Sequence, residues 1–288
     1  MKSLRDYIAA ARKTHTAIGH FNISTLDGVW AVVDAAKELD LPVIVGVSEG
    51  ERDYVGVRQI AAIVKSIREE RGQPVFLNAD HTYSFERVKE AIDAGFDSVI
   101  FDGAQLSLEE NIAITKQCVE YSRSKNSIPL IEGELGFIGT SSKVLDAIPS
   151  GAVVGDDAMT KPADAERFVR ETGIDMLAPA VGNIHGMIRG GDPALNARRV
   201  KEIAEAVDIP LVLHGASGNT AEDIRKTIKN GVAIVHVNTE LRLAYRAGLI
   251  KSLSEDPDEI SPYKYLKPAK LAMQKVVGDK LRIISMVQ

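Results

Sequence analysis

The sequence predicts an α/β fold, a (β/α)8 or TIM barrel with a helical extension at its C-terminal end. Three observations lead to this prediction. The chain has 288 residues, which is long for one average domain and normal for an α/β barrel. Eight short apolar runs alternate with amphipathic segments, and no linker or change of composition separates them. We therefore expect one domain that spans residues 1–288.

The expected strands are short runs rich in β-branched and apolar residues. In chain order they cover residues 17–21, 42–47, 74–79, 98–102, 128–134, 175–181, 209–215 and 232–238. Many of the segments between them begin with Ser, Thr or Asp and end with Gly, as capped helices do. The charged residues 1–15 are expected to form a surface helix, and residues 261–284 the C-terminal extension. A doubly wound open sheet is the alternative fold, but no GxGxxG follows the first strand.

Composition excludes several classes of protein. The net charge is −5 and no block of Lys or Arg is present, which disfavours a nucleic-acid partner. No apolar run approaches the length needed to span a bilayer, and the charged N-terminal segment does not resemble a signal peptide. Cys118 is the single cysteine, so a disulfide framework is excluded. These features fit a cytoplasmic location and no membrane partner.

Polar residues collect at the predicted C-terminal ends of the strands, where barrels of this type carry their chemistry. Asp80 and His81 follow directly on the third strand. The other residues in comparable positions are Asp102, Glu132, Glu134, His185, His214, His236 and Asn238. The two remaining histidines, His15 and His20, are interpreted as structural.

Three of these histidines predict a metal site. A lone Asp at a strand end is more often a helix cap, and a lone buried His is more often a hydrogen-bonded core residue. His81, His185 and His214 come from separate strand ends, however, and barrel strands converge in space. Three neutral imidazoles would leave a zinc ion one open position for a substrate oxygen.

Two segments have the composition of phosphate-binding sites. Residues 214–224 place small residues between the seventh strand and the next helix, and Asn238 and Thr239 stand at the start of the following helix. Backbone N–H groups at such positions bind anions. Ordinary turns and caps would use the same residues. Next to His214, the pair of segments favours a phosphorylated substrate.

Five stretches together resemble the class II, zinc-dependent fructose-bisphosphate aldolases, a family that includes the tagatose-bisphosphate aldolases. They are "ADHTYSFERVKEAIDAGFDSVIFDG", "EGELG", "GNIHG", "LVLHGASG" and "NTEL". The resemblance runs from about residue 21 to residue 277. It implies a lyase of glycolysis or related carbohydrate metabolism. Such an enzyme would reversibly cleave fructose 1,6-bisphosphate to dihydroxyacetone phosphate and glyceraldehyde 3-phosphate.

The resemblance also implies roles for individual residues. The ligands of the catalytic zinc would be His81, His185 and His214, and a second metal site beside it would use Asp102 and Glu134. Asp80 matches the acid that exchanges a proton with the C4 oxygen. The expected substrate-binding residues are Ser48, Gly186, Gly215, Ala216, Ser217, Asn238 and Thr239. Members of the family are usually dimers or tetramers and often bind a monovalent cation, so a homodimer or homotetramer is expected here.

These residue types suit the reaction. Cleavage of the C3–C4 bond leaves negative charge on an enediolate, which a zinc ion stabilises as a Lewis acid. The C4 hydroxyl loses its proton as the bond breaks, so a carboxylate beside the metal is needed as a general base. The position of Asp80 next to His81 meets this need.

The sequence departs from the family pattern at three places. Relatives usually carry a Gly-Gly and an acid on a mobile loop after "ELG", where this chain has residues 141–143, Ser-Ser-Lys. The usual Asn on the eighth strand aligns with His236, and an Arg found in many relatives aligns with residues 262–263, Pro-Tyr. The acceptor of the C3 proton is therefore open. His236 is the candidate we expect, and the loop carboxylates Asp146, Asp156 and Asp157 are the alternative.

Three functions remain in competition. Zinc-dependent cleavage of fructose 1,6-bisphosphate is the expected one. A tagatose-bisphosphate or other ketose-phosphate substrate is the first alternative, because the departures affect residues near the substrate. A non-catalytic partner subunit is the second alternative, although the presence of Asp80 and the three histidines argues against it. A metal-dependent amidohydrolase is disfavoured because the first strand lacks a His-x-His pair.

Overall fold

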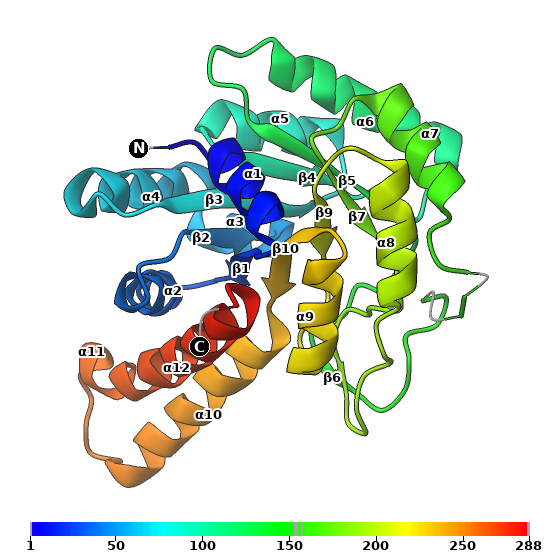
Figure 1. The fold of residues 1–288 in the computed structure, drawn as a ribbon. Coiled ribbons are helices and arrows are strands. Elements are labelled where there is room, and N and C mark those ends of the chain that lie inside the picture. The colour runs from blue at the N-terminus through cyan, green and yellow to red at the C-terminus, as the bar shows by residue number, and fades with distance from the viewer. Residues whose placement is uncertain (1, 153–154, 157, 287–288) are drawn as a thin grey trace.

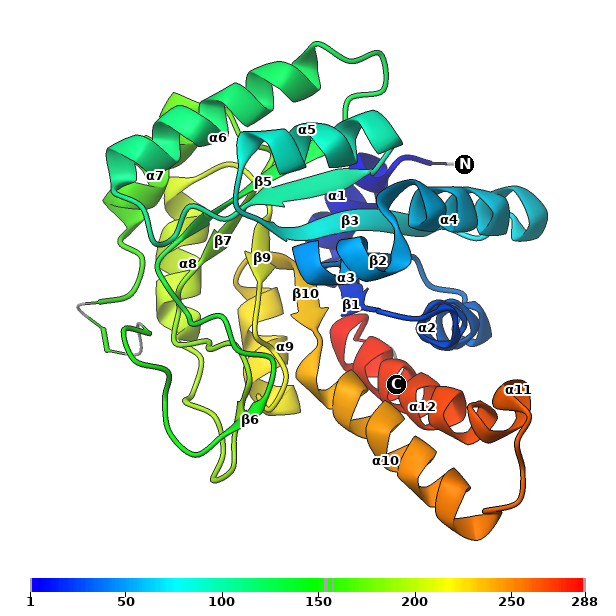
Figure 2. The same cartoon turned by 180° about the vertical axis from the view of Figure 1, so that it is seen from behind.

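The computed structural model describes residues 2–152, 155–156 and 158–286, and its framework is a closed barrel of parallel strands (Figures 1 and 2). Around the barrel the order is β1, β10, β9, β7, β5, β4, β3, β2. All eight expected strands are present, and the closure of the sheet rules out the doubly wound alternative. The barrel strands are β1 (Ile18–Asn22), β2 (Val43–Val47), β3 (Val75–Thr82), β4 (Ser98–Phe101), β5 (Leu130–Leu135), β7 (Met176–Pro179), β9 (Leu211–Leu213) and β10 (Val232–Val237).

Helices surround the barrel because each connection between parallel strands crosses back over the outside of the sheet. The α5 helix is representative: the Ser84 side chain caps its start, and Gly95 ends it in a left-handed conformation. The residues Val88, Ala91 and Ile92 of this helix face the core. The helices of this layer are α2 (Leu26–Glu38), α3 (Glu49–Val55), α4 (Val57–Arg71), α5 (Phe85–Ala94), α6 (Leu108–Arg123), α7 (Pro162–Thr172), α8 (Ala197–Ala206) and α9 (Ala221–Lys229).

The α1 helix (Leu4–Thr14) closes the N-terminal end of the barrel. Its Leu4, Ile8 and Ala11 are buried against residues that point into the barrel from the strands, among them Ile18, Ile44, Phe76 and Ile234. One face of α1 is therefore part of the core, although its charged residues favour a surface helix. This apolar plug leaves the opposite, C-terminal end of the barrel for polar side chains.

The C-terminal part of the chain forms a helical hairpin that extends away from the barrel (Figures 1 and 2). It consists of α10 (Thr239–Glu255), α11 (Pro262–Tyr265) and α12 (Lys267–Ile284), with α12 packed between α10 and α2. This confirms the predicted helical extension and shows that α10 belongs to it. Within the described residues, no helix has the length and apolar character needed to cross a membrane.

A feature that the sequence did not predict is a separate sheet of two short parallel strands, β6 (Val144–Leu145) and β8 (Met187–Ile188). It joins the long loop after β5 to the loop after β7, and the Met187 N–H donates to the Lys143 carbonyl at 3.0 Å. The pairing places the Ser-Ser-Lys segment of the first loop close to the end of the barrel that carries the polar residues.

Candidate metal centre and active site

A cavity of about 570 Å³ opens among the C-terminal ends of the strands. Eleven of the fourteen residues predicted for the site contribute to its lining: Ser48, Asp80, His81, His185, Gly186, His214, Gly215, Ser217, His236, Asn238 and Thr239. Asp102 and Glu134 lie behind this lining, next to His81. Ala216 is fully buried. The fold thus gathers residues that are far apart in the sequence into one site.

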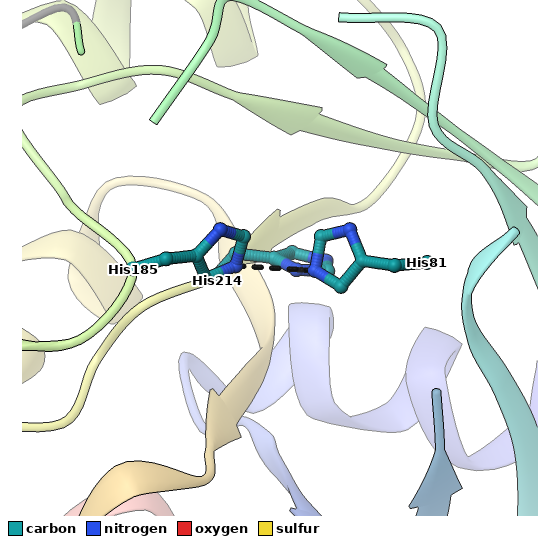
Figure 3. A group of neighbouring side chains, drawn as sticks. All are labelled: His81, His185 and His214. Carbon is teal, nitrogen blue, oxygen red and sulfur yellow. Dashed lines mark hydrogen bonds between the residues drawn. The ribbon is translucent and has the colours of Figure 1, made fainter. Parts of the chain in front are cut away.

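His81, His185 and His214 converge on one point (Figure 3). The Nε2 atom of His81 lies 3.1 Å from Nε2 of His185 and 3.2 Å from Nδ1 of His214. One nitrogen from each ring falls within 4.8 Å of the others. Three imidazole nitrogens that face one another this closely are a donor set that fits a tetrahedral zinc ion with one open position.

The second nitrogen of each ring is held by the protein. Nδ1 of His81 lies 2.9 Å from a carboxylate oxygen of Asp102, and Nδ1 of His185 donates to the Gly139 carbonyl at 2.5 Å. Nε2 of His214 lies 2.7 Å from Glu132. Such partners fix the tautomer, so that the free nitrogen of each ring is directed to the centre. This arrangement is the one that a resident metal ion requires.

The electrostatics around the centre also fit a divalent cation. Burial raises the pKa of Glu134 well above its usual value, and the neighbouring Asp102 raises it further. Burial lowers the pKa of His185 to about 4, which keeps this imidazole neutral and able to bind a metal. Burial would also lower the pKa of His81, but Asp80 and Asp102 next to it raise that pKa well above normal. Cationic charge is therefore favoured at this point.

A second group of possible ligands lies beside the first. His81, Asp102 and Glu134 each offer a ligand atom within 4.8 Å of the others. Glu134 Oε2 is 3.6 Å from His81 Nδ1, and this oxygen is buried without a hydrogen-bond partner among the described residues. Burial of a carboxylate oxygen without a partner lowers the stability of the folded protein, and a bound cation would supply the missing partner. The geometry accommodates the predicted second metal position.

An irregularity in β3 explains how the neighbouring residues Asp80 and His81 reach the same cavity. In a regular strand, adjacent side chains point to opposite faces. Here the register between β3 and β4 shifts between Ala79 and Thr82, and His81 has a positive φ of 41°. The fully buried Arg52 of α3 holds this stretch by donating to the Asp80 carbonyl at 3.3 Å and to the Thr82 hydroxyl at 3.1 Å.

One further side chain holds Asp80 in the cavity wall by a hydrogen bond, and a second lies beside it. The Asn22 amide donates to Asp80 Oδ2 at 2.8 Å, and His236 Nδ1 lies 3.3 Å from Oδ1. Burial would raise the pKa of Asp80, but His81 and His236 lower it well below its usual value. The group is therefore a carboxylate at neutral pH and can accept a proton from a substrate hydroxyl.

The predicted phosphate-binding segments lie next to each other at the cavity wall. Ser217 Oγ accepts a hydrogen bond from the Asn238 N–H at 3.2 Å, and α10 begins at Thr239. Gly215 has a φ of 62°, and a side chain on it would overlap the Ile184 carbonyl, so glycine is required there. The N-terminus of a 17-residue helix and a serine hydroxyl are typical components of an anion site.

Among the residues of the site that the sequence did not indicate, four have contacts that bear on its chemistry. Asn22 and Arg242 line the cavity, and the buried Glu51 connects them. Glu51 accepts from Asn22 Nδ2 at 3.0 Å and from Arg242 Nη2 at 2.6 Å. His20, interpreted as structural, stacks on His236. Of these, Asn22 stands at the end of the first strand, where the strand-end rule could have identified it.

The long loop after β5 brings polar residues into the cavity, but neither Asp146 nor Asp156, two of the loop carboxylates considered as proton acceptors. Residues 140–143 line the cavity. Asp146 is exposed and pairs with Arg189 at 3.0 Å, and Asp156 pairs with Arg198 at 3.2 Å. Neither aspartate is part of the lining. Asp157, the third loop candidate, lies outside the described residues.

Comparisons with known proteins find similarity over nearly the whole chain. The family described as "Fructose-bisphosphate aldolase class-II" matches residues 2–288. A fructose-bisphosphate aldolase of Staphylococcus aureus is 37% identical over 283 residues, covering 97% of this chain and 96% of the relative. A 6-phospho-5-dehydro-2-deoxy-D-gluconate aldolase of Bacillus licheniformis is 38% identical, covering 97% and 93%. The crystal structure of the YdjI aldolase from Escherichia coli K12 superposes with a TM-score of 0.82 at 29% identity, covering 98% of this chain and 96% of that one.

Proposed function

Because the chain belongs to the class II fructose-bisphosphate aldolase family, a family of metal-dependent lyases, we propose that it reversibly cleaves fructose 1,6-bisphosphate. The products would be dihydroxyacetone phosphate and glyceraldehyde 3-phosphate. One observation carries this proposal: three imidazole nitrogens converge beside the carboxylate of Asp80, in a cavity that is also lined by Ser217 and the start of α10.

The residues that would hold the metal are His81, His185 and His214, and we propose zinc as the ion. When bound, zinc supplies Lewis-acid stabilisation of the negative charge that develops on the substrate during cleavage. Asp102 and Glu134 would serve a second position beside it. The lowered pKa of His185 and the buried carboxylates around the three imidazoles support this assignment.

Asp80 would act on the C4 hydroxyl. In the cleavage direction it accepts the hydroxyl proton while the C3–C4 bond breaks, so that C4 leaves as an aldehyde and the bonding electrons stay on the C3 side. The hydrogen bond from Asn22 keeps one carboxylate oxygen in place, and the depressed pKa keeps the group ionised. Both features support a general base.

The C3 carbon must take up a proton after cleavage and lose one before condensation. We propose His236 for this transfer, because it lines the cavity next to Asp80 on the rigid strand β10. The loop aspartates Asp146 and Asp156 are engaged in ion pairs outside the cavity lining, which weakens the alternative. An imidazole is a suitable acid and base for such a step.

Two anion-binding regions would hold the phosphates. The first is formed by Gly186, Gly215 and Ser217 with the start of α10, and it suits the dihydroxyacetone phosphate end. Arg242, on the same cavity wall as Ser48, could bind the other phosphate. Among the described residues, Lys143 is the second cation in the lining.

We further propose a homodimer or homotetramer assembled through the helical hairpin. Several large apolar side chains on it are exposed: Leu243, Ile250, Leu253, Ile260, Tyr263 and Leu271. Scattered apolar residues are normal on a surface, but a group on one projecting hairpin is typical of a subunit contact. The monovalent cation, the cytoplasmic location and the single-domain organisation remain predictions.

A second candidate substrate is tagatose bisphosphate or another ketose phosphate. Two observations support this candidate. The Bacillus licheniformis relative is named for a different phosphorylated substrate, and the Ser-Ser-Lys loop of this chain lines the cavity.

The test is cleavage of fructose 1,6-bisphosphate, tagatose 1,6-bisphosphate and fructose 1-phosphate by the purified protein. Each substrate is assayed before chelation, after chelation and after zinc is restored. We expect the highest kcat/KM with fructose 1,6-bisphosphate and loss of activity with the chelator. A higher kcat/KM for tagatose 1,6-bisphosphate would contradict the proposed substrate, and full activity after complete metal removal would contradict the metal site.

A further inference from the structure

His20 and His236 form a stacked pair inside the barrel. Their ring centroids are 3.4 Å apart and the rings are nearly parallel, at 4°. The other neighbour of His236 is the metal-site residue His214, with centroids 3.9 Å apart. His236 therefore contacts two other imidazoles, one of which, His20, has no role in the reaction as described so far.

The position of His20 follows from the strand register. His20 in β1 and His236 in β10 are direct neighbours on two paired parallel strands, and both side chains point into the barrel. The ring of His20 occupies the space above Gly46 of the adjacent strand β2. A Cβ atom on Gly46 would overlap the imidazole. Only a glycine at position 46 therefore leaves room for a side chain as large as histidine at position 20.

The ring of His20 is fixed by hydrogen bonds below the site. Asn78 donates its amide to Ser98 Oγ at 2.7 Å, which leaves its Oδ1 as the acceptor for His20 Nε2 at 3.1 Å. This chain of three side chains sets both the plane and the tautomer of His20. The residue is 0% exposed and is not part of the cavity lining, so it has no access to substrate.

We propose that His20 is a positioning residue that holds the imidazole of His236 in its working orientation. The flat, immobile face of His20 keeps the His236 ring in one plane, with Nδ1 3.3 Å from Asp80 Oδ1. Without this face the ring could turn about its terminal torsion, which is soft in histidine. The inference rests on the proposed role of His236 as the group that exchanges the C3 proton.

The experiment separates the stacking face of His20 from its hydrogen bond. The His20→Phe variant keeps a flat ring and loses the donor to Asn78, whereas His20→Gln keeps a donor and loses the ring. Exchange of the C3 proton of dihydroxyacetone phosphate is followed by NMR in deuterated water. We expect nearly full exchange for His20→Phe and a loss of roughly 10- to 100-fold for His20→Gln, the scale of a slightly misplaced group. Zinc content and thermal midpoint are measured for each variant.

Two further variants show whether His20 acts through His236. The exchange rate of the double variant His20→Gln/His236→Asn should equal that of His236→Asn alone. A further loss in the double variant would mean that His20 acts by another route and would overturn the proposal. Loss of zinc in His20→Gln, or a rate as high as wild type, would overturn it as well.

Failure of the proposed function has a different signature. If His236→Asn exchanges the proton at the wild-type rate, His236 is not the exchanging group, and the stacking proposal fails with it. If His236→Asn loses exchange while His20→Gln retains it, only the proposal for His20 fails. Should His20→Gln not fold, Gly46→Ala provides a second perturbation, because its added methyl group must displace the His20 ring. Unchanged exchange in a folded Gly46→Ala variant would then overturn the proposal.

Discussion

Oδ1 of Asp80 lies 3.3 Å from Nδ1 of His236, so the groups proposed for the two proton transfers of the reaction are neighbours in the cavity wall. The C3 and C4 carbons of the substrate are joined by the bond that breaks. Proton transfer at each carbon therefore requires two groups within a few bond lengths of each other. The two groups come from different strands, Asp80 from β3 and His236 from β10, and β2 and β1 lie between these strands in the barrel.

The first prediction concerns the carboxylate. Asp80→Asn should keep the bound metal, because the three imidazoles remain, and should lose bond cleavage by about 100-fold or more, as is typical for removal of a general base. Steady-state cleavage and metal analysis of the same preparation test this. Asp208→Asn, which changes an exposed aspartate outside the cavity, is the control. Turnover of Asp80→Asn close to that of the control would refute the role of Asp80.

The second prediction concerns the metal. His214→Ala should lose both zinc and cleavage, since two imidazoles do not make a complete site. Removal of the ring also leaves the buried Glu132, 2.7 Å from His214, without its partner. His15→Ala, a change at an exposed histidine, is the matched control. Stoichiometric zinc in the His214→Ala protein would show that the metal binds elsewhere.

The fold was predictable because its signals are local. Each barrel strand is a short apolar run, and most helices of the outer layer have caps and a helical spacing that can be read from a few residues. The pair β6 and β8 was not predictable, since each strand has two residues and the partners are separated by more than forty positions. The buried face of α1 was missed because Leu4, Ile8 and Ala11 are interspersed with charged residues.

The site was predictable to the extent that strand ends mark it. The rule that barrel chemistry lies at the C-terminal ends of strands was enough to select Asp80 and the histidines after it. It could not select His20, which lies in the middle of β1, because its stack on His236 depends on strand register and on the space above Gly46. Arg242 likewise lies on a helix, and its direction depends on the buried Glu51.

The third prediction concerns stability and pH in the metal-free protein. Burial, with repulsion from His236, lowers the pKa of His20 from 6.5 to about 3. Between pH 6.5 and pH 3, His20 therefore binds up to one proton more in the unfolded chain than in the folded chain. The contribution of His20 to the free energy of unfolding is complete above pH 6.5. It decreases by about 1.4 kcal/mol for each pH unit as the pH falls towards 3.

This pH dependence can be measured with a variant that does not titrate. Between pH 7 and pH 5 the loss from His20 is about 2 kcal/mol, which the His20→Phe protein does not undergo. The thermal midpoint of the chelated wild-type protein should therefore fall further over this interval than that of chelated His20→Phe. Equal decreases in the two midpoints would contradict the depressed pKa of His20.

The last prediction concerns the second phosphate of the substrate. Arg242 lines the cavity, and one of its terminal nitrogens donates to the buried Glu51 at 2.6 Å. This ion pair directs the guanidinium and leaves its other N–H groups for an anion. Arg242→Gln should therefore raise the KM for fructose 1,6-bisphosphate by about 10-fold or more, the scale of one charge-assisted hydrogen bond. Fructose 1-phosphate lacks the second phosphate, so its KM should change little.

Arg246→Gln, one turn further along α10 and outside the lining, is the control. If Arg242→Gln raises both KM values equally, Arg242 supports the cavity as a whole and does not bind the second phosphate.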